Sequence, residues 1–181
     1  MSSVEAPMLN TPKGLSAYKY IDYQLNEDPK KVLINKLKEV LLRVSKMDGF
    51  RILICIPKID AIDRIYTILE DMDLDKSIGK IYSKNKVEQN EENCKCDIIL
   101  CTFKSIGTGA NIKNLRVIIN LDPFSSTVTM HQLSGRLREL NDKDDTFFID
   151  FVDRSTPQAV NSYNSRKKYM KTKAKKILID K

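Results

Sequence analysis

The sequence predicts an α/β fold in which helices cover both faces of a parallel sheet. Short runs that are almost continuously apolar, such as RILICI at 51–56 and RVIINL at 116–121, are typical of strands buried on both faces. Amphipathic segments with helical spacing alternate with these runs, as in βα-repeat proteins. The 181 residues, 41% of them apolar and 30% charged, suit one globular domain with a sizeable core.

The elements can be assigned in chain order. Residues 1–16 contain two prolines and no periodicity, so we expect a linker or flexible arm there, followed by one domain over 17–181. The periodicity predicts strands at 18–25, 51–56, 79–83, 97–102, 116–121 and 146–153, and a polar loop up to Asn93. It predicts helices at 30–46, which Gly49 terminates, at 61–72, at 125–140 with Ser125 or Ser126 as N-cap, and at 156–176.

Several classes of protein are disfavoured. No apolar run approaches the roughly 20 residues that cross a bilayer, and the N-terminus lacks the basic start and apolar centre of a signal peptide. We therefore expect a cytoplasmic protein without a membrane partner. Among four cysteines only Cys94 and Cys96 are close in sequence, and His131 is the sole histidine, so we expect no metal site.

The net charge of +7 is concentrated near the C-terminus. Of 31 basic residues, seven lie within 164–176, and the remaining 24 equal the 24 acidic residues in number. Such a basic helix favours a polyanionic partner, most often nucleic acid, although a solvated helix that merely aids solubility is the alternative. The seven are Arg166, Lys167, Lys168, Lys171, Lys173, Lys175 and Lys176.

The segment TFKSIGTGANI, residues 102–112, follows a predicted strand and contains Gly107 and Gly109. Glycines let a backbone approach a ligand closely, and exposed amides and hydroxyls suit phosphate or ribose oxygens. The sequence has no GxxxxGK followed by Ser or Thr, so no complete phosphate-binding loop is present. This segment can contribute to a phosphate site without forming one alone.

In HQLSGRLREL, residues 131–140, Leu133, Leu137 and Leu140 form one apolar helical stripe. Gln132 and Arg136 are four residues apart, so they lie together on a helical face next to the leucine stripe. A surface pair between Arg136 and Glu139, three residues on, is the simplest interpretation of the arginine.

Taken together, RILICIP, CTFKSIGTGANI and HQLSGRLREL resemble motifs IV, V and VI of superfamily 2 helicases, in order and spacing. The resemblance covers about residues 50–153 and implies the C-terminal RecA-like lobe, which has the fold of P-loop NTPases without its own P-loop. The lysine-, isoleucine- and asparagine-rich composition, with DPFSS and GRLR, looks most like phage or large-virus DNA helicases.

The resemblance assigns roles to individual residues. Motif V implies that Thr102 touches the nucleic-acid backbone, and that Gly109 and Asn111, with Gly107, approach the nucleotide; asparagine replaces the usual aspartate at 111. Gln132, Gly135 and Arg136 match the QxxGR of motif VI, which implies that Gln132 belongs to the catalytic site and that Arg136 is an arginine finger on the γ-phosphate of ATP. The candidate nucleic-acid ligands in addition to Thr102 are Lys58, Lys104, Lys167, Lys168 and Lys171.

The second arginine of motif VI departs from the family pattern GRxxR, because Glu139 occupies its place and Arg138 is two residues beyond Arg136. Two residues of a continuous helix subtend about 200°, so both arginines could face one phosphate only if the helix ended near Leu137. Arg136 is therefore the stronger catalytic candidate, with Arg138 as the second.

The resemblance implies one lobe of an ATP-dependent helicase or translocase. An N-terminal lobe, in cis or in trans, would hold ATP and Mg²⁺, and the partner would be single-stranded or duplex nucleic acid, with DNA favoured over RNA. If viral, it would act in the host cytoplasm, and the isolated chain would be inactive. The alternatives are a stand-alone helicase-like regulatory or docking module and a plain nucleic-acid binder that uses its basic tail.

Overall fold

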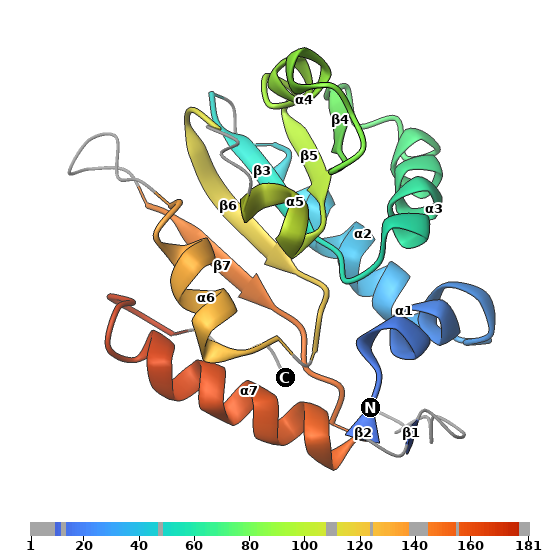
Figure 1. The fold of residues 1–181 in the computed structure, drawn as a ribbon, viewed down its shortest axis with the longest axis vertical. Coiled ribbons are helices and arrows are strands. Elements are labelled where there is room, and N and C mark those ends of the chain that lie inside the picture. The colour runs from blue at the N-terminus through green and yellow to red at the C-terminus, as the bar shows by residue number, and fades with distance from the viewer. Residues whose placement is uncertain are drawn as a thin grey trace.

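Five parallel strands form the central sheet, in the order β4-β5-β3-β6-β7. Figure 1 shows the sheet with helices on either side of it. This is the predicted parallel α/β fold. The computed structural model describes residues 10–11, 14–46, 49–107, 112–123, 125–137, 145–154 and 156–177.

The sheet strands are β3 (Arg51–Cys55), β4 (Ile78–Ile81), β5 (Ile98–Cys101), β6 (Leu115–Asn120) and β7 (Phe147–Asp150). The helices are α1 (Ala17–Asn26), α2 (Val32–Val44), α3 (Ile59–Glu70), α4 (Val87–Asn93), α5 (Phe103–Gly107), α6 (Thr127–Ser134) and α7 (Pro157–Met170). Within the stretch expected to be a linker, β1 (Asn10–Thr11) and β2 (Gly14–Leu15) pair antiparallel.

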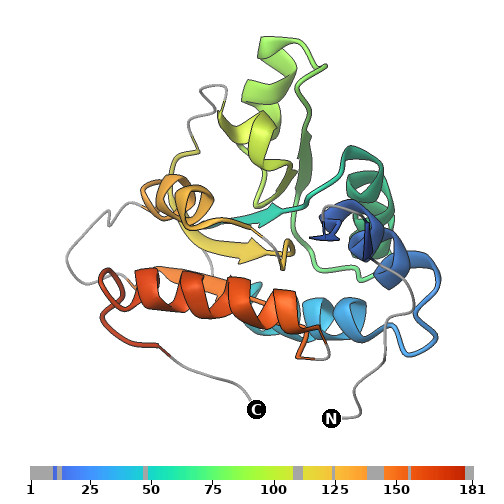
Figure 2. The same cartoon turned by 60° about the horizontal axis from the view of Figure 1, so that its bottom comes forward.

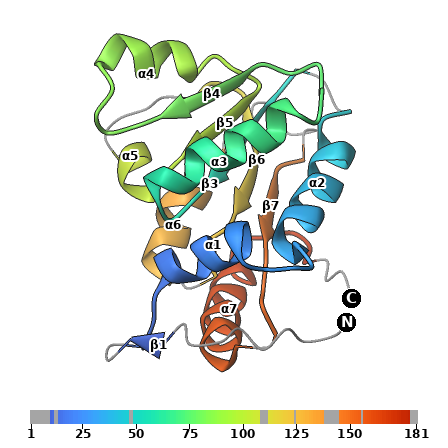
Figure 3. The same ribbon diagram turned by 90° about the vertical axis from the view of Figure 1, so that its right-hand side faces the viewer.

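Each central strand is buried on both faces, which explains why its sequence does not alternate. In β3, Ile52 and Ile54 face the core beneath α1, α2 and α3, whereas Leu53 and Cys55 face the core on the other side. Figure 3 shows α1, α2 and α3 in front of the sheet. The second core includes Ile106 of α5 and Leu133 of α6.

The segment 18–25 was predicted as a strand, and that prediction is wrong, because it lies within helix α1. Its buried residues are Tyr20, Ile21, Tyr23 and Gln24, and this i, i+1, i+3, i+4 spacing is helical. Three tyrosines at alternating or near-alternating positions mimic a strand pattern in the sequence. The helical stripe instead packs against α2 and α3.

Helix α4 replaces the polar loop predicted before Asn93, and it covers the outer edge of β4. Asn93 donates its side-chain amide to the carbonyl of Lys80 at 2.7 Å. Asn90 donates to the carbonyl of Tyr82 at 2.8 Å and accepts from its backbone N–H at 3.3 Å. Asparagine side chains thus satisfy backbone groups that another strand would otherwise pair.

Gly79 allows this close approach of helix and strand. A Cβ atom at Gly79 would lie 2.6 Å from the backbone oxygen of Asn93. A larger residue would push α4 away from the edge of the sheet. The spacing of β4 and α4 therefore requires glycine at this position.

Candidate functional site

Several of the predicted site residues lie where β3, β5 and β6 end, as expected for an open parallel sheet. Lys58 follows β3, Thr102 follows β5, and α6 with Gln132 follows β6. The in-register pairing of Cys55 with Cys101 and with Asn120 places these three strand ends side by side. Segments that are distant in sequence therefore meet at the carboxyl end of the sheet.

Helix α6 presents the arginine of the HQLSGR segment. The Ser126 side chain caps the helix by accepting from the Thr129 N–H at 3.2 Å, as predicted for Ser125 or Ser126. The helix ends at Ser134, so the prediction that it runs to Leu140 is wrong at its C-terminal end. Gly135 caps it, and Arg136 lies in the following turn.

Arg136 joins the two segments that resemble motifs V and VI. Its Nη2 donates to the carbonyl of Ile106 in α5, a bond between residues 30 positions apart. The guanidinium is also close to the end of β3: burial raises the pKa of the Cys55 thiol, and the positive charge of Arg136 opposes that increase. Arg136 is therefore half-buried at the sheet edge, where an anionic group could replace a backbone carbonyl as its partner.

Thr102 acts locally as the cap of α5. Its hydroxyl accepts from the Ser105 N–H at 3.2 Å and lies 2.8 Å from the Ser105 hydroxyl. Both side chains are buried. The hydroxyl fixes the turn that follows β5, and Lys104, within this turn, is exposed.

Lys58 forms an ion pair that the sequence did not predict. Its Nζ lies 2.7 Å and 3.0 Å from the two carboxylate oxygens of Asp22 in α1, and 3.6 Å from Asp60. The hydrogen bond to Asp22 raises the pKa of Lys58. A second contact holds the same helix, because Tyr20 hydrogen-bonds to Asp153 beyond β7; burial, then Asp153, raises the pKa of Tyr20.

A buried polar network joins β6, β7 and α7. Arg166 has 1% of its side chain exposed and binds Asp150 through two bonds, Nε to Oδ2 at 2.8 Å and Nη2 to Oδ1 at 3.1 Å. Asn120 donates to Asp150 at 2.9 Å. Burial raises the pKa of Asp150, although the bonds from Arg166 and Asn120 act to lower it.

The basic C-terminal segment differs from its prediction in two respects. Helix α7 ends at Met170 rather than near residue 176. Arg166 points into the protein, so it does not belong to the exposed basic surface. Lys168 and Lys171 are exposed, whereas Lys167 is half-buried with its Nζ 5.7 Å from the Tyr163 ring centroid. Figure 2 shows α7 along its length.

Three predicted residues, Gly109, Asn111 and Arg138, lie outside the described part of the chain, as does Glu139 of the alternative surface pair. Gly107 is the last residue of α5. Gln132 is exposed on α6, one turn before Arg136. The structure thus joins Arg136 to α5, with Gln132 one turn earlier on α6, while Lys58 at the end of β3 is paired with Asp22.

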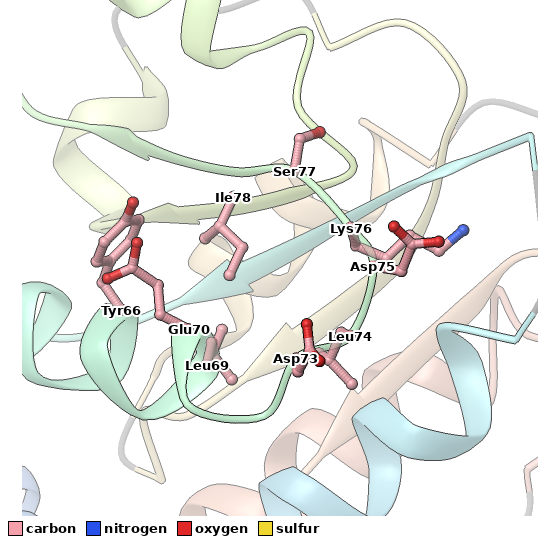
Figure 4. A pocket seen from close by; sticks show the side chains of 9 residues that line it. All are labelled: Tyr66, Leu69, Glu70, Asp73, Leu74, Asp75, Lys76, Ser77 and Ile78. Carbon is pink, nitrogen blue, oxygen red and sulfur yellow. The ribbon is translucent and has the colours of Figure 1, made fainter.

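A pocket of about 460 Å³ lies elsewhere, at the amino-terminal end of β4 (Figure 4). Tyr66 and Glu70 line it from α3, and Asp73, Asp75 and Ser77 line it from the turn before the strand. Because parallel strands begin at one edge and end at the other, this pocket is distinct from the candidate site.

The described residues were searched for metal sites and for membrane-spanning helices. They contain no group of three or more His, Cys, Asp or Glu side chains placed to hold a metal ion. None of their helices is long and apolar enough to cross a membrane.

Comparison with protein families gives one match: the helicase conserved C-terminal domain matches residues 32–139, more than half of the chain. Comparison with curated proteins by sequence gave no match.

Several solved structures share the fold. T4 UvsW superposes with a TM-score of 0.60 at 11% identity, over 84% of this chain and 37% of UvsW. The E. coli DEAD-box protein SrmB, solved with regulator of ribonuclease activity A, gives 0.57 at 13% identity, over 71% and 77%. S. cerevisiae Dbp5 bound to RNA and ADP BeF3 gives 0.56 at 15% identity, over 73% and 35%. The chain thus spans little more than a third of UvsW and Dbp5.

Proposed function

This chain belongs to the family of helicase conserved C-terminal domains, and from that premise we propose that it is the C-terminal lobe of an ATP-dependent nucleic-acid helicase or translocase. In this proposal ATP and Mg²⁺ are held mainly by an N-terminal lobe with its own phosphate-binding loop. The present lobe supplies an arginine and part of the nucleic-acid track. Nucleotide hydrolysis then drives opening and closing of the cleft between the lobes.

The contact between Arg136 and the Ile106 carbonyl is the observation that carries the proposal. It supports the proposal because it joins the segment that resembles motif VI to α5, in the segment that resembles motif V, near the carboxyl ends of the strands. A guanidinium fits the terminal phosphoryl group of a nucleotide, because its planar donors match phosphate oxygens. Its role would be to neutralise the charge that develops as the phosphoryl group is transferred. Arg138, two residues on, is the second candidate.

The remaining predicted residues would act around this arginine. Gln132 is exposed one turn before it, and Gly107, Gly109 and Asn111 belong to the segment that would approach the nucleotide. The proposed contacts to the nucleic-acid backbone are Lys58 and Lys104 at the carboxyl end of the sheet and Lys167, Lys168 and Lys171 of the C-terminal segment. Thr102 would join them only if its buried hydroxyl left the cap of α5. Lys58 would first have to exchange Asp22 for a phosphate.

The test replaces Arg136 in a protein that contains both lobes. Arg136→Ala should lower kcat for ATP by a factor of about 10³ or more, because arginine fingers contribute roughly 10³ to 10⁵ in rate. The KM for ATP and the affinity for nucleic acid should change little. Arg43→Ala, which removes an exposed arginine of α2, is the matched control. Unchanged turnover in Arg136→Ala with a loss in Arg138→Ala would transfer the role to Arg138.

The isolated chain distinguishes this proposal from its alternatives. It should hydrolyse no ATP above background, with or without nucleic acid, and should regain activity when a lobe with a phosphate-binding loop is supplied. Activity of the isolated chain would contradict the division between two lobes. A stand-alone regulatory module would remain inactive with every such lobe.

We further propose DNA as the track. The sequence resemblance to phage or large-virus DNA helicases supports DNA, whereas Dbp5 was solved with RNA. Binding of single-stranded DNA and RNA of the same length and sequence, at equal salt, compares the two. Tighter binding of RNA would contradict the choice of DNA.

A further inference from the structure

A buried arginine of α7 holds the backbone from which α6 begins. Nη1 of Arg166 donates to the carbonyl of Pro123 at 2.8 Å and to that of Ser125 at 3.3 Å. These carbonyls belong to the residues three positions and one position before Ser126, the N-cap of α6. A buried guanidinium is costly unless its donors are bonded, so these bonds fix the loop as firmly as they fix the arginine.

Asp150 sets the orientation of that arginine. Its carboxylate binds the Nε and Nη2 donors of Arg166, which leaves Nη1 directed at the loop. Asn120 completes the arrangement by donating to Asp150, to the Asp122 carbonyl at 3.1 Å and to the Ser125 hydroxyl at 3.0 Å. The ends of β6 and β7 and the middle of α7 thus converge on one short loop.

The loop leads into α6, the helix that ends just before Arg136. Helix α6 has 8 residues and spans about 12 Å, and Met130 and Leu133 bury its inner face. A packed helix moves as a unit, so a shift at its first turn is carried to the turn that holds Arg136. We propose that Arg166, oriented by Asp150, is a positioning residue that places Arg136 at the candidate site. The effect of this positioning on catalysis rests on the proposed function, in which Arg136 is the arginine finger.

The fork shape of arginine is essential to this role. Arg166 uses three nitrogens to reach one carboxylate and two carbonyls, whereas lysine has a single nitrogen at the end of a flexible chain. Arg166→Lys therefore keeps the positive charge beside Asp150 and loses part of the hold on Pro123 and Ser125. A role limited to charge balance would be preserved in this variant.

The first test measures amide hydrogen exchange in the chain itself. In Arg166→Lys, the amides from Thr129 to Arg136 should exchange at least tenfold faster than in the unmodified chain. The control is Leu37→Ala, which removes packing beneath α2, compared at a denaturant concentration that equalises global stability. If the two variants show equal exchange in α6, Arg166 contributes only to overall stability and the proposal is overturned.

A second variant serves if Arg166→Lys fails to fold. Asp150→Asn keeps the side-chain volume and Arg166 itself but removes the carboxylate that orients it and that Asn120 also binds, so it too is compared with Leu37→Ala at equal global stability. The same local increase in exchange is expected from it, of smaller size but more than twofold, and equal exchange in variant and control again overturns the proposal.

The second test uses the protein with both lobes. Arg166→Lys should lower kcat at least tenfold and leave the KM for ATP within twofold, because Arg166 touches neither substrate. If the amides of α6 exchange faster but kcat is unchanged, the result would support Arg166 as the residue that positions Arg136. It would contradict the proposal that Arg136 is the arginine finger. The two proposals therefore fail in different experiments.

Discussion

The ammonium group of Lys58 lies between the two carboxylate oxygens of Asp22, at 2.7 Å and 3.0 Å, so a helix that precedes the family match neutralises the cation at the end of β3. Helix α1 is anchored at the same edge by Tyr20, which hydrogen-bonds to Asp153. A phosphate that approaches Lys58 must compete with Asp22. The pairing therefore weakens any contribution of Lys58 to nucleic-acid binding.

Asp22→Asn should strengthen that contribution. With Lys58 released, the plot of the log of the association constant against the log of the salt concentration should steepen by about 0.7 for single-stranded DNA, the value of one added phosphate contact. Fluorescence anisotropy at several salt concentrations measures the slope. Asp60→Asn changes the net charge equally but removes only the 3.6 Å contact of a carboxylate that is 77% exposed. Equal slopes in the two variants would show that Lys58 is not a ligand.

The covered edge of β4 gives a prediction about stability. Asn90→Ala removes two bonds to the backbone of Tyr82 and should lower the free energy of unfolding by about 2 kcal/mol. Urea denaturation measures the loss, and sedimentation velocity should show more self-association because an unpaired strand edge attracts another. Gln89→Ala, one position earlier on the exposed side of α4, should change neither quantity.

Asp63 predicts a dependence of stability on pH. The hydrogen bond from Lys80, and then that from Tyr82, lower the pKa of Asp63 below its ordinary value. A lowered folded-state pKa contributes stability that is complete above the unfolded pKa of about 3.9 and is lost as the pH falls through the folded value. Asp63→Asn should therefore lower both Tm and the free energy of unfolding at pH 7. The loss of free energy should be at most about 1 kcal/mol, because the carboxylate is exposed.

Thermal unfolding between pH 7 and pH 2.5 measures this difference. It should shrink below about pH 4, where the carboxylate of the unmodified chain also becomes neutral. Asp71→Asn, an exposed carboxylate at the end of the same helix, should give a smaller difference at pH 7. A difference between Asp63→Asn and the unmodified chain that persists at pH 2.5 would assign the effect to packing instead of charge.

Strands were easier to predict than helix ends. The apolar runs at 51–56 and 116–121 became β3 and β6, since burial on both faces leaves few polar positions to confuse the pattern. Helix α4 has no buried residue and was missed, because its residues satisfy a strand edge through asparagine amides rather than through an apolar stripe. The end of α6 was missed because Leu137 continues the apolar spacing beyond the Gly135 cap.

The positions of the candidate residues in the fold were predictable where these residues follow strands and not where they depend on tertiary pairing. Thr102 could be placed at the carboxyl end of the sheet because it directly follows an apolar run, and Arg136 because it lies in the helical segment predicted after the run at 116–121. The burial of Arg166 could not be predicted, because its partner Asp150 lies 16 residues earlier and no local pattern connects the two. Asp22 is likewise 36 residues from Lys58. Ion pairs of this kind decide which cations of a basic chain remain exposed.

The basic surface is consequently smaller than the sequence indicates, and deletion of residues after Asn164 would remove the buried Arg166 together with the exposed lysines. Substitution of Lys167, Lys168 and Lys171 by glutamine leaves the network of Arg166 intact and tests the surface alone. If all three contact single-stranded DNA, the magnitude of the salt slope should fall by about 2, from roughly 0.7 for each phosphate contact, with an unchanged Tm. Fluorescence anisotropy across salt concentrations measures this slope, and a slope equal to that of the unmodified chain would mean that the segment is a solvated helix. The control for the loss of three positive charges is a second triple variant, in which glutamine replaces Lys31, Lys38 and Lys46 in and next to α2.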